Sequence, residues 1–174
     1  MTCPIIYDFG KNTPNFFLSN FYPTPITVTF VIPGAEPLAE TYPSTEHAFQ
    51  AAKTYDVTER REFQNFEMKA WKAKQLGRVV TLRKDWNSSK VATMAALLNI
   101  KFSNPALREA LLATVPKMII EGNYWHDIFW GVCFCTDKKH HGEGLNTLGR
   151  LLMNTRQSIL TAPKENPVVT AEAA

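Results

Sequence analysis

The chain has 174 residues, of which 45% are hydrophobic and 20% are charged, and its formal net charge is +3 at pH 7. This length suits one domain, and the composition is that of a globular protein. The mild basicity is compatible with an anionic small molecule. It lacks the basic face or stripe that most nucleic-acid-binding proteins carry.

The sequence predicts neither a signal peptide nor a membrane span. The opening residues, MTCPIIYDFGKN, contain an early acid and no apolar core region, and no apolar run approaches the roughly 18 residues of a span. The cysteines, Cys3, Cys133 and Cys135, are odd in number and poorly spaced for disulfides. We therefore expect a reduced, cytoplasmic protein.

The N-terminal quarter is expected to be extended. Prolines recur between residues 1 and 43 and break helices, while the β-branched run at 26–32 predicts a strand. Pro33-Gly34 marks a turn, after which residues 37–42 can pair back as a second strand. The expected product is a small antiparallel sheet.

The chain from Ser44 onward is expected to be mainly helical, with a short strand at 117–121. Ser44 is the predicted N-cap of the first helix, whose apolar face carries alanines and Tyr55. Further helices are predicted at 66–76, with Gly77 as the C′ residue, and after Asn104-Pro105. A helix capped by Asn87 or Ser88 is predicted to carry the apolar stripe Val91, Met94, Ala95, Leu98 and Phe102. The last helix is predicted from about Leu145, with Leu145, Leu148, Leu152 and Ile159 buried. The predicted fold class is a helix-rich α+β single domain over residues 1–160, followed by a loose tail at 161–174.

The first helix offers one candidate site. Glu46, Phe49, Gln50 and Lys53 share the face opposite the alanines, and this face is either solvated or the wall of a pocket. Glu46 lies in the first turn, where the helix dipole favours its ionised form. An ionised carboxylate can activate water or stabilise positive charge on a sugar. His47 points away from this face, so we expect it to cap the helix or pack in the core.

A second candidate site is the aromatic segment at 125–131. The rings of Trp125 and Trp130 can stack on a flat ligand, while Asp127 can hold a polar edge or a sugar hydroxyl. The alternative is an ordinary turn capped by Asp127. Downstream, Gly142 and Gly144 precede a helix and can leave backbone N–H groups free for a phosphate, although such loops are commonly only tight turns.

The cysteines do not predict a metal site. Cys133-x-Cys135 together with His140-His141 matches no common structural zinc spacing. We therefore expect no metal and no cofactor, and we expect both cysteines to be small apolar residues of a strand.

Several segments, taken in chain order, resemble the YbiA/NADAR family. They are FLSNFY at 17–22, YPSTEHAFQAAK at 42–53, Gly77-Arg78, LRxDW at 82–86, Met94, Lys101-Phe102, NPxLR at 104–108, WxD at 125–127, Trp130-Gly131 and GxNxLGRLLM at 144–153. The resemblance implies the family fold and hydrolysis of N-glycosidic bonds. Its implied substrates are ribosylaminopyrimidine phosphates of riboflavin synthesis or ADP-ribosylated guanine in nucleic acid.

The motifs and the resemblance together define the expected site. Glu46 is the first choice for the carboxylate that stabilises an oxocarbenium-like ribose or activates water, and Asp127 is the second. Lys53 is expected to protonate the leaving group or to form an imine with an opened sugar. The expected substrate-binding residues are Asn20, Phe21, Tyr22, Gln50, Arg83, Trp86, Trp125, Trp130, Gly131, Gly142, Gly144, Asn146 and Arg150.

Two other functions remain open at this point. A module that binds ADP-ribose or a relative without cleaving it would need the aromatic and glycine elements but not Glu46 and Lys53. A nucleic-acid-binding protein is the other, although Lys69, Lys72 and Lys74 form the only local basic cluster in the sequence. No membrane partner is expected, and the sequence leaves the oligomeric state open.

Overall fold

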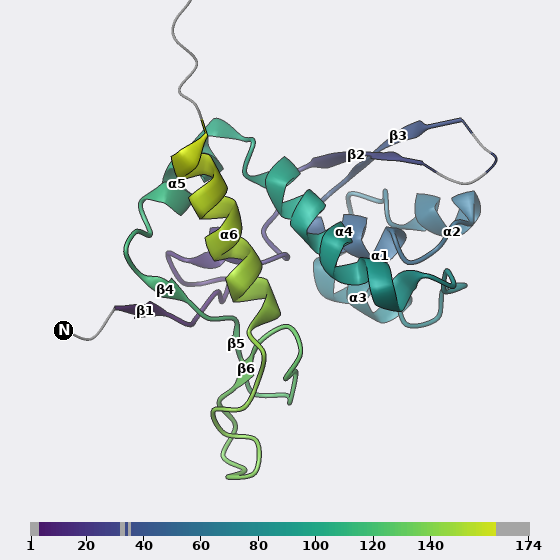
Figure 1. Ribbon diagram of the computed structural model, residues 1–174. Coiled ribbons are helices and arrows are strands. Elements are labelled where there is room, and N and C mark those ends of the chain that lie inside the picture. The colour runs from purple at the N-terminus through teal and green to yellow at the C-terminus, as the bar shows by residue number, and fades with distance from the viewer. Residues whose placement is uncertain (1–3, 32–33, 35, 163–174) are drawn as a thin grey trace, which may run out of the picture.

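The computed structural model describes residues 4–31, 34 and 36–162, and within them the chain is helix-rich, as predicted (Figure 1). Of the helices described, none is long and apolar enough to cross a lipid bilayer. The helical elements are the 3-10 helix η1 (Phe16–Leu18), α1 (Thr45–Ala51), α2 (Val57–Glu62), α3 (Ala70–Leu76), α4 (Trp86–Lys101), α5 (Pro105–Leu112) and α6 (Thr147–Thr161).

The predicted antiparallel hairpin is confirmed. Strand β2 (Ile26–Phe30) pairs with β3 (Leu38–Tyr42), with Ile26 opposite Tyr42. Residues 32 and 33 of the predicted strand and turn lie outside the described part of the chain. The short strand predicted at 117–121 is confirmed by β4 (Met118–Ile119), but the two short parallel pairs that join distant segments were not anticipated. These pairs are β1 (Ile5–Ile6) with β4, and β5 (Gly122–Asn123) with β6 (Val132–Cys133).

Helix α4 lies at the centre of the helical arrangement and contacts both α1 and α6 (Figure 1). It buries Met94, Leu97 and Leu98, which come from a wider face than the predicted stripe. The expectation for Val91 was wrong, because this side chain is 36% exposed at the outer edge of the helix. Burial of this face, together with apolar residues of α1, α5 and α6, supplies the main hydrophobic stabilisation of the fold.

Two predicted helix starts were displaced by local contacts. Helix α3 begins at Ala70 rather than at residue 66, because the side chain of Asn65 accepts from Glu67 N–H over 2.9 Å and forms a turn instead. Helix α4 begins at Trp86, and its N-cap, Asp85, lies two to three residues before the predicted caps. Trp86 is the first residue of the helix, and its ring packs in the core.

The last helix begins at Thr147, two residues after the predicted start near Leu145, and the predicted burial of Leu145 was wrong. Leu145 is 59% exposed, and its backbone N–H donates to the carbonyl of Ile128 rather than to a helix turn. Leu148 and Leu152 are buried as predicted, and Ile159 packs against the core at its edge. The helix runs through Thr161, the first residue of the predicted tail, and residues 163–174 lie outside the described part of the chain.

The predicted roles of Asn104 and His47 are confirmed. The Asn104 side chain accepts from the backbone N–H groups of Ala106 and Leu107, which caps α5. His47 is 2% exposed, and its two ring nitrogens bond to the hydroxyl of Ser44 and the carbonyl of Met68. His47 therefore joins the start of α1 to the segment before α3, away from the reactive face.

A buried ion pair attaches the hairpin to α2. Arg60 is fully buried and donates to both carboxylate oxygens of Glu40, over 2.9 and 3.1 Å, while the Tyr42 hydroxyl donates to the same carboxylate over 2.6 Å. A buried charge is tolerated only when it is paired and hydrogen-bonded, as it is here. The hairpin and α2 are thereby fixed beside α1, which carries the candidate site.

Candidate active site

Helix α1 forms the floor of the candidate site, and its polar face is buried. Glu46 is 5% exposed and Gln50 is 4% exposed. The ring of Phe49 lies 5.0 Å from Trp86 and 5.5 Å from Trp130, measured between centroids. The solvated alternative for this face is therefore wrong. The face is enclosed by aromatic packing and by contacts of α1 with α3 and α4.

The carboxyl group of Glu46 is fixed by its neighbours. Gln50 Nε2 donates to Glu46 Oε1 over 2.7 Å, and the Glu46 backbone N–H donates to the carbonyl of Asn20 over 2.9 Å. Burial raises the pKa of Glu46, and the Gln50 hydrogen bond and the charges of Lys74 and Lys53 only partly offset this rise. Desolvation therefore opposes the ionised form that the position of Glu46 in the first turn favours.

Buried oxygens without partners gather around Glu46. In the described part of the chain, the buried side-chain oxygens that lack a hydrogen-bond partner are Asn20 Oδ1, Thr45 Oγ1, Gln50 Oε1 and Glu121 Oε2. Thr45 precedes Glu46, Gln50 bonds to it, and Asn20 accepts its backbone N–H. Because buried polar groups in folded proteins are nearly always paired, these oxygens are suited to receive hydrogen bonds from a ligand.

Lys53 lies just beyond the last turn of α1, on the same face as Glu46. Its Nζ donates to the carbonyl of Gly77 over 2.8 Å, and the side chain is half-buried. Burial lowers the pKa of Lys53, Glu46 raises it, and the nearby charges of Lys74 and Arg78 lower it further. A lysine with a lowered pKa can give up its proton or act as a nucleophile more readily than an exposed one.

Glu121 joins the site and was not among the residues predicted from the sequence. It lies between β4 and β5, where its backbone N–H donates to Asn146 Oδ1 over 2.9 Å. Burial raises the pKa of Glu121 to about 7; Lys74 opposes the rise, and Asp127 and Glu46 add to it. Glu46, Glu121 and Asp127 are thus close enough for their charges to interact.

Asp127 caps a turn and also contributes charge to the site. Asp127 Oδ1 accepts from Trp130 N–H over 2.9 Å, and the buried side chain of Asn123 binds both the backbone N–H and the carbonyl of Asp127, over 3.0 and 2.8 Å. The turn-capping alternative from the sequence is therefore confirmed. Its negative charge raises the pKa of Glu46 and Glu121, so both roles belong to the same residue.

The rim of the site is exposed and aromatic. Trp125 is 64% exposed, and Lys74 Nζ from α3 lies 5.8 Å from the centroid of its ring. Lys74 was considered only as part of a basic surface cluster in the sequence. The structure instead places it within electrostatic range of Glu46, Glu121 and Lys53. The helical periodicity of α3 alone does not predict that Lys74 belongs to the site, because its proximity to Glu46 comes from the packing of α3 on α1.

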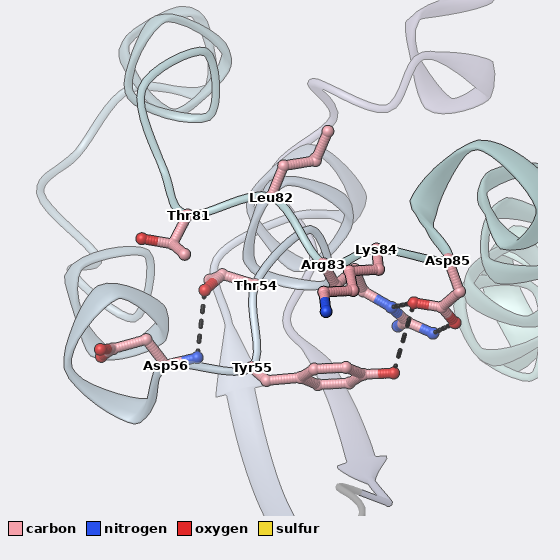
Figure 2. Close-up of a pocket in the computed structure, with 8 residues that line it drawn as sticks. All are labelled: Thr54, Tyr55, Asp56, Thr81, Leu82, Arg83, Lys84 and Asp85. Carbon is pink, nitrogen blue, oxygen red and sulfur yellow. Dashed lines mark hydrogen bonds and ion pairs between the residues drawn. The ribbon is translucent and has the colours of Figure 1, made fainter.

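Arg83 lines a separate hollow of about 440 Å³ together with residues 54–56 and 81–85 (Figure 2). Arg83 Nε donates to Asp85 Oδ1 over 2.7 Å, and the guanidinium lies 4.7 Å from the ring centroid of Tyr55. Its backbone N–H donates to the Lys53 carbonyl over 2.8 Å. Neither Glu46 nor Asp127 lines this hollow, so the structure does not bring Arg83 together with the two candidate carboxylates, although its backbone adjoins that of Lys53.

The predicted anion loop is tied into the fold. Gly142 N–H donates to the Cys133 carbonyl over 2.8 Å, and Asn146 N–H donates to the Gly131 carbonyl over 3.3 Å. The expectation of free amides is wrong for these two groups, because the loop pairs with the neighbouring chain. Gly144 has a φ of 146°, and a Cβ there would collide with the Gly131 carbonyl, so close packing explains this glycine.

Asn146 has a structural role at the same junction. It adopts a left-handed conformation with φ 51°, and its side chain donates to the Ile119 carbonyl over 2.9 Å as well as accepting from Glu121 N–H. Gly131 is required because a Cβ would meet the carbonyl of Glu121. Asn146 and Gly131 therefore position the backbone of Glu121, rather than standing free for a substrate.

The remaining predicted ligands are dispersed. Phe21 and Tyr22 are half-buried after η1, and Tyr22 packs edge-on against Phe16 with centroids 5.4 Å apart. Trp86 is 6% exposed, so its ring supports Phe49 from within the core. Arg150 is exposed on α6. The site that the structure assembles is therefore narrower than the predicted set.

The geometry defines a helix-rich α+β protein whose buried α1 face meets carboxylates and lysines from three other segments. A model of the NADAR domain matches residues 8–160. The chain belongs to the NADAR family.

Proteins of known name are similar over most of this chain. N-glycosidase YbiA of Escherichia coli (strain K12) is 36% identical over 143 residues, which cover 81% of this chain and 79% of YbiA. The NMR structure of E. coli YbiA matches with a TM-score of 0.74 and 32% identity, and the match covers 95% of this chain and 93% of that one. The predicted family and fold class are thereby confirmed.

Two longer relatives carry names from riboflavin biosynthesis. The riboflavin biosynthesis protein PYRR of Zea mays is 34% identical over 145 residues, which are 76% of this chain but 22% of PYRR. The riboflavin biosynthesis protein VVA0006 of Vibrio vulnificus is 33% identical over 157 residues, covering 88% of this chain and 38% of VVA0006. The chain therefore spans only a part of these two relatives.

Proposed function

We propose that the protein is an N-glycosidase that hydrolyses the bond between a ribose carbon and a base-like nitrogen. Its similarity to N-glycosidase YbiA over most of both chains supports this activity. The observation that carries the proposal is the grouping of Glu46 with Glu121, Asp127 and Lys53 beside buried oxygens that lack partners. Such a grouping offers acid, base and ribose-binding groups in one place.

The buried oxygens match the chemistry of a ribose. Asn20 Oδ1 and Gln50 Oε1 can each accept a hydrogen bond from a sugar hydroxyl, which would satisfy a group that is otherwise buried without a partner. A substrate lacking the hydroxyls would leave both oxygens unpaired. Selection for a hydroxylated ring therefore follows from the same two residues that contact Glu46.

The proposed reaction breaks the bond from C1′ to nitrogen, and the bonding electrons leave with the nitrogen. Positive charge then builds on the ribose and is stabilised by Glu46, with Asp127 as the second carboxylate. Glu121, with its pKa raised to about 7, donates a proton to the leaving nitrogen. A water molecule adds to C1′ and gives its proton to a carboxylate, which completes the hydrolysis.

Lys53 and Lys74 give the site its positive charge. Both lie within electrostatic range of Glu46, and neither is engaged by a carboxylate salt bridge among the described residues. A phosphate on the substrate would be attracted to such a pair. We assign Lys53 to this binding role, because Glu121 is the proton donor that we propose for the leaving group.

Two substrate classes fit this site. One is a ribosylaminopyrimidine phosphate, which the riboflavin-related relatives suggest by name. The other is ADP-ribose attached to guanine, for which the exposed ring of Trp125 beside Lys74 offers a surface for a base and a phosphate. Both have a ribose linked through C1′ to nitrogen, so both require the same chemistry.

The test is to incubate the purified protein in parallel with a ribosylaminopyrimidine phosphate and an ADP-ribosylated guanine oligonucleotide, and to separate the products by chromatography. Release of a free pyrimidine or of ADP-ribose, abolished in Glu46→Gln, is the expected result and names the substrate class. Tight binding of ADP-ribose, with no product released from either substrate, would contradict the N-glycosidase proposal and favour a binding module.

A further inference from the structure

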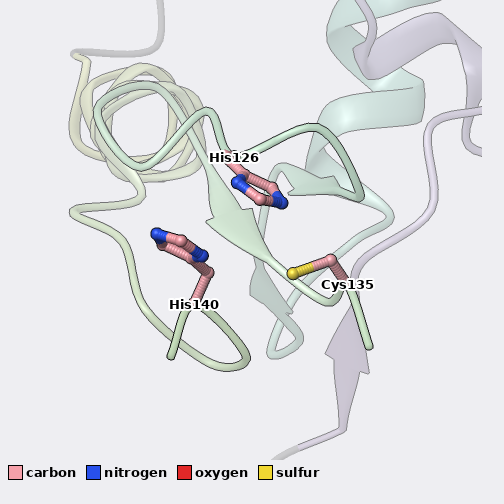
Figure 3. A group of neighbouring side chains, drawn as sticks. All are labelled: His126, Cys135 and His140. Carbon is pink, nitrogen blue, oxygen red and sulfur yellow. The ribbon is translucent and has the colours of Figure 1, made fainter. Parts of the chain in front are cut away.

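A cluster of metal-binding side chains lies at the outer end of the turn that carries Asp127. One ring nitrogen of His126, one of His140 and the Sγ atom of Cys135 all lie within 4.8 Å of one another (Figure 3). The residues come from two segments, the turn after β5 and the loop after β6. None of the three belongs to the candidate active site described above.

The loop already holds His140 in a defined orientation. His140 Nδ1 lies 3.2 Å from Asp137 Oδ2, and the backbone N–H of His140 donates to the Asp137 carbonyl over 3.0 Å. Asp137 Oδ1 also accepts from Lys139 N–H over 3.0 Å. A carboxylate on one ring nitrogen leaves the other for a metal, and such carboxylate–histidine pairs are a recurring feature of zinc sites.

His126 is presented by an unusual backbone conformation. Its φ is 66°, which is rare for residues other than glycine. The buried Asn123 side chain fixes the conformation by accepting from the N–H groups of Trp125 and Asp127, on either side of His126. The ring of His126 stacks on that of His140, with centroids 4.3 Å apart and an angle of 32° between the planes. The two imidazoles therefore lie side by side, and each has a ring nitrogen within 4.8 Å of the Cys135 Sγ atom.

We propose that His126, Cys135 and His140 bind a zinc ion. One thiolate and two imidazoles are ligands that Zn²⁺ prefers, and three protein ligands leave a fourth position for water. With Zn–N bonds of about 2.0 Å and a Zn–S bond of about 2.3 Å, the ligand atoms of a tetrahedral site lie roughly 3.3–3.8 Å apart. Since no two ligand atoms lie more than 4.8 Å apart, zinc binding needs them to close by no more than about one ångström, which small side-chain rotations can supply because neither ring is buried.

Residues that are neighbours in the sequence do not all belong to the cluster. Cys133 and Cys135 are both buried thiols, and His140 and His141 are adjacent, yet only one of each pair joins the cluster. His141 Nδ1 is instead bonded to the Cys135 carbonyl over 2.9 Å. The third ligand, His126, lies nine positions before Cys135, outside the Cys133–His141 segment whose spacing matches no common zinc pattern.

A bound zinc would join the loop after β6 to the turn that presents Asp127 and Trp130. His126 immediately precedes Asp127, so fixing its imidazole restrains the backbone of that turn. The metal would thus act as a clamp at the edge of the candidate site, without contacting the reacting atoms. The binding of zinc itself does not depend on the proposed N-glycosidase activity.

The test uses isothermal titration of the full chain, with any purification tag removed and metal first stripped by a chelator, with zinc chloride as the only ligand. We expect one zinc ion per chain. His126→Asn keeps a residue that tolerates the left-handed backbone. We expect this variant, Cys135→Ser and His140→Ala each to weaken zinc binding by about 100-fold or more, since even residues behind a metal ligand change affinity by about 10- to 100-fold.

Two matched variants serve as controls. Cys133→Ser and His141→Ala are expected to weaken zinc binding clearly less than the three ligand variants, because neither side chain supplies a ligand atom of the cluster. Titration with cobalt(II) adds a second readout, because a thiolate–cobalt absorption band is expected in the unaltered chain and absent in Cys135→Ser. Absence of zinc uptake by the unaltered chain, or equal loss in the controls, would overturn the assignment.

Discussion

The floor and the rim of the candidate site differ in how they are built. On the floor, Glu46 and Gln50 are almost fully buried, and their side chains bond to each other. On the rim, Tyr124 and Trp125 are 66% and 64% exposed. The difference indicates that the chemistry depends on groups fixed by the core, whereas the exposed rings are free to meet substrates of different size. The predictions below test this division of roles.

The largest effect is expected for Glu46→Gln. The change removes the charge that stabilises the ribose but keeps a side chain of the same shape, so kcat should fall by about 1,000-fold or more with little change in KM. Steady-state kinetics and circular dichroism check activity and fold together. Glu67→Gln, at an exposed position, is the matched control and should retain full activity.

The second effect concerns pH. If Glu121 donates a proton with a pKa of about 7, kcat/KM has an alkaline limb that falls as the pH rises through this value, because the carboxyl group loses its proton. Glu121→Gln should lower kcat by about 100-fold and abolish this alkaline limb. If the pH–rate profile of Glu121→Gln keeps the alkaline limb, the group that loses its proton near pH 7 is not Glu121.

The third effect is on stability. A Cβ at Gly77 would collide with the side chain of Gln50, whose Nε2 holds Glu46. Gly77→Ala should therefore lower the free energy of unfolding by about 1–3 kcal/mol, as overpacking of a core does. Urea denaturation measures this change. Ala substitution at Gly34, which has open space around it but also a positive φ, is the comparison for backbone strain alone.

Smaller effects are expected at the rim. Trp125→Ala removes a stacking surface without touching the floor, so KM should rise by about 10-fold while kcat stays within about 2-fold. A large loss of kcat in this variant would contradict the separation of binding from chemistry. Steady-state kinetics on the substrate identified by chromatography decides between the two outcomes.

The smallest effect is expected for Arg83→Gln. Arg83 is engaged by Asp85 in a different hollow, and exposed ion pairs contribute roughly 0–1 kcal/mol to stability. We expect kcat and KM within about 2-fold of the unaltered protein. A strong rise in KM would instead restore Arg83 to the substrate-binding role that the sequence suggested.

The sequence predicted elements with strong local patterns and missed those made by tertiary contacts. The β-branched run of β2 and the Asn104-Pro105 cap act within a few residues, so both could be read directly. The two-residue pairs β1–β4 and β5–β6 have no periodicity to detect. Their partners are distant in the chain, and only the packed structure brings them together.

The same distinction holds for the site. Glu46, Gln50 and Lys53 follow one helix face, which the sequence reveals by spacing alone. Glu121 lies in a short segment between strands, and its proximity to the others depends on Asn146 holding its backbone from 25 positions away. Lys74 reaches the site only because α3 packs on α1.

The most direct test of the account is to measure binding of intact substrate to Glu46→Gln, alone and combined with Trp125→Ala, by calorimetry. We predict that Glu46→Gln binds the substrate and leaves it uncleaved over hours, and that adding Trp125→Ala weakens binding by about 10-fold. Cleavage by Glu46→Gln at the unaltered rate, or loss of binding in a folded Glu46→Gln protein, would contradict the claim that the buried floor performs the chemistry and the rim binds.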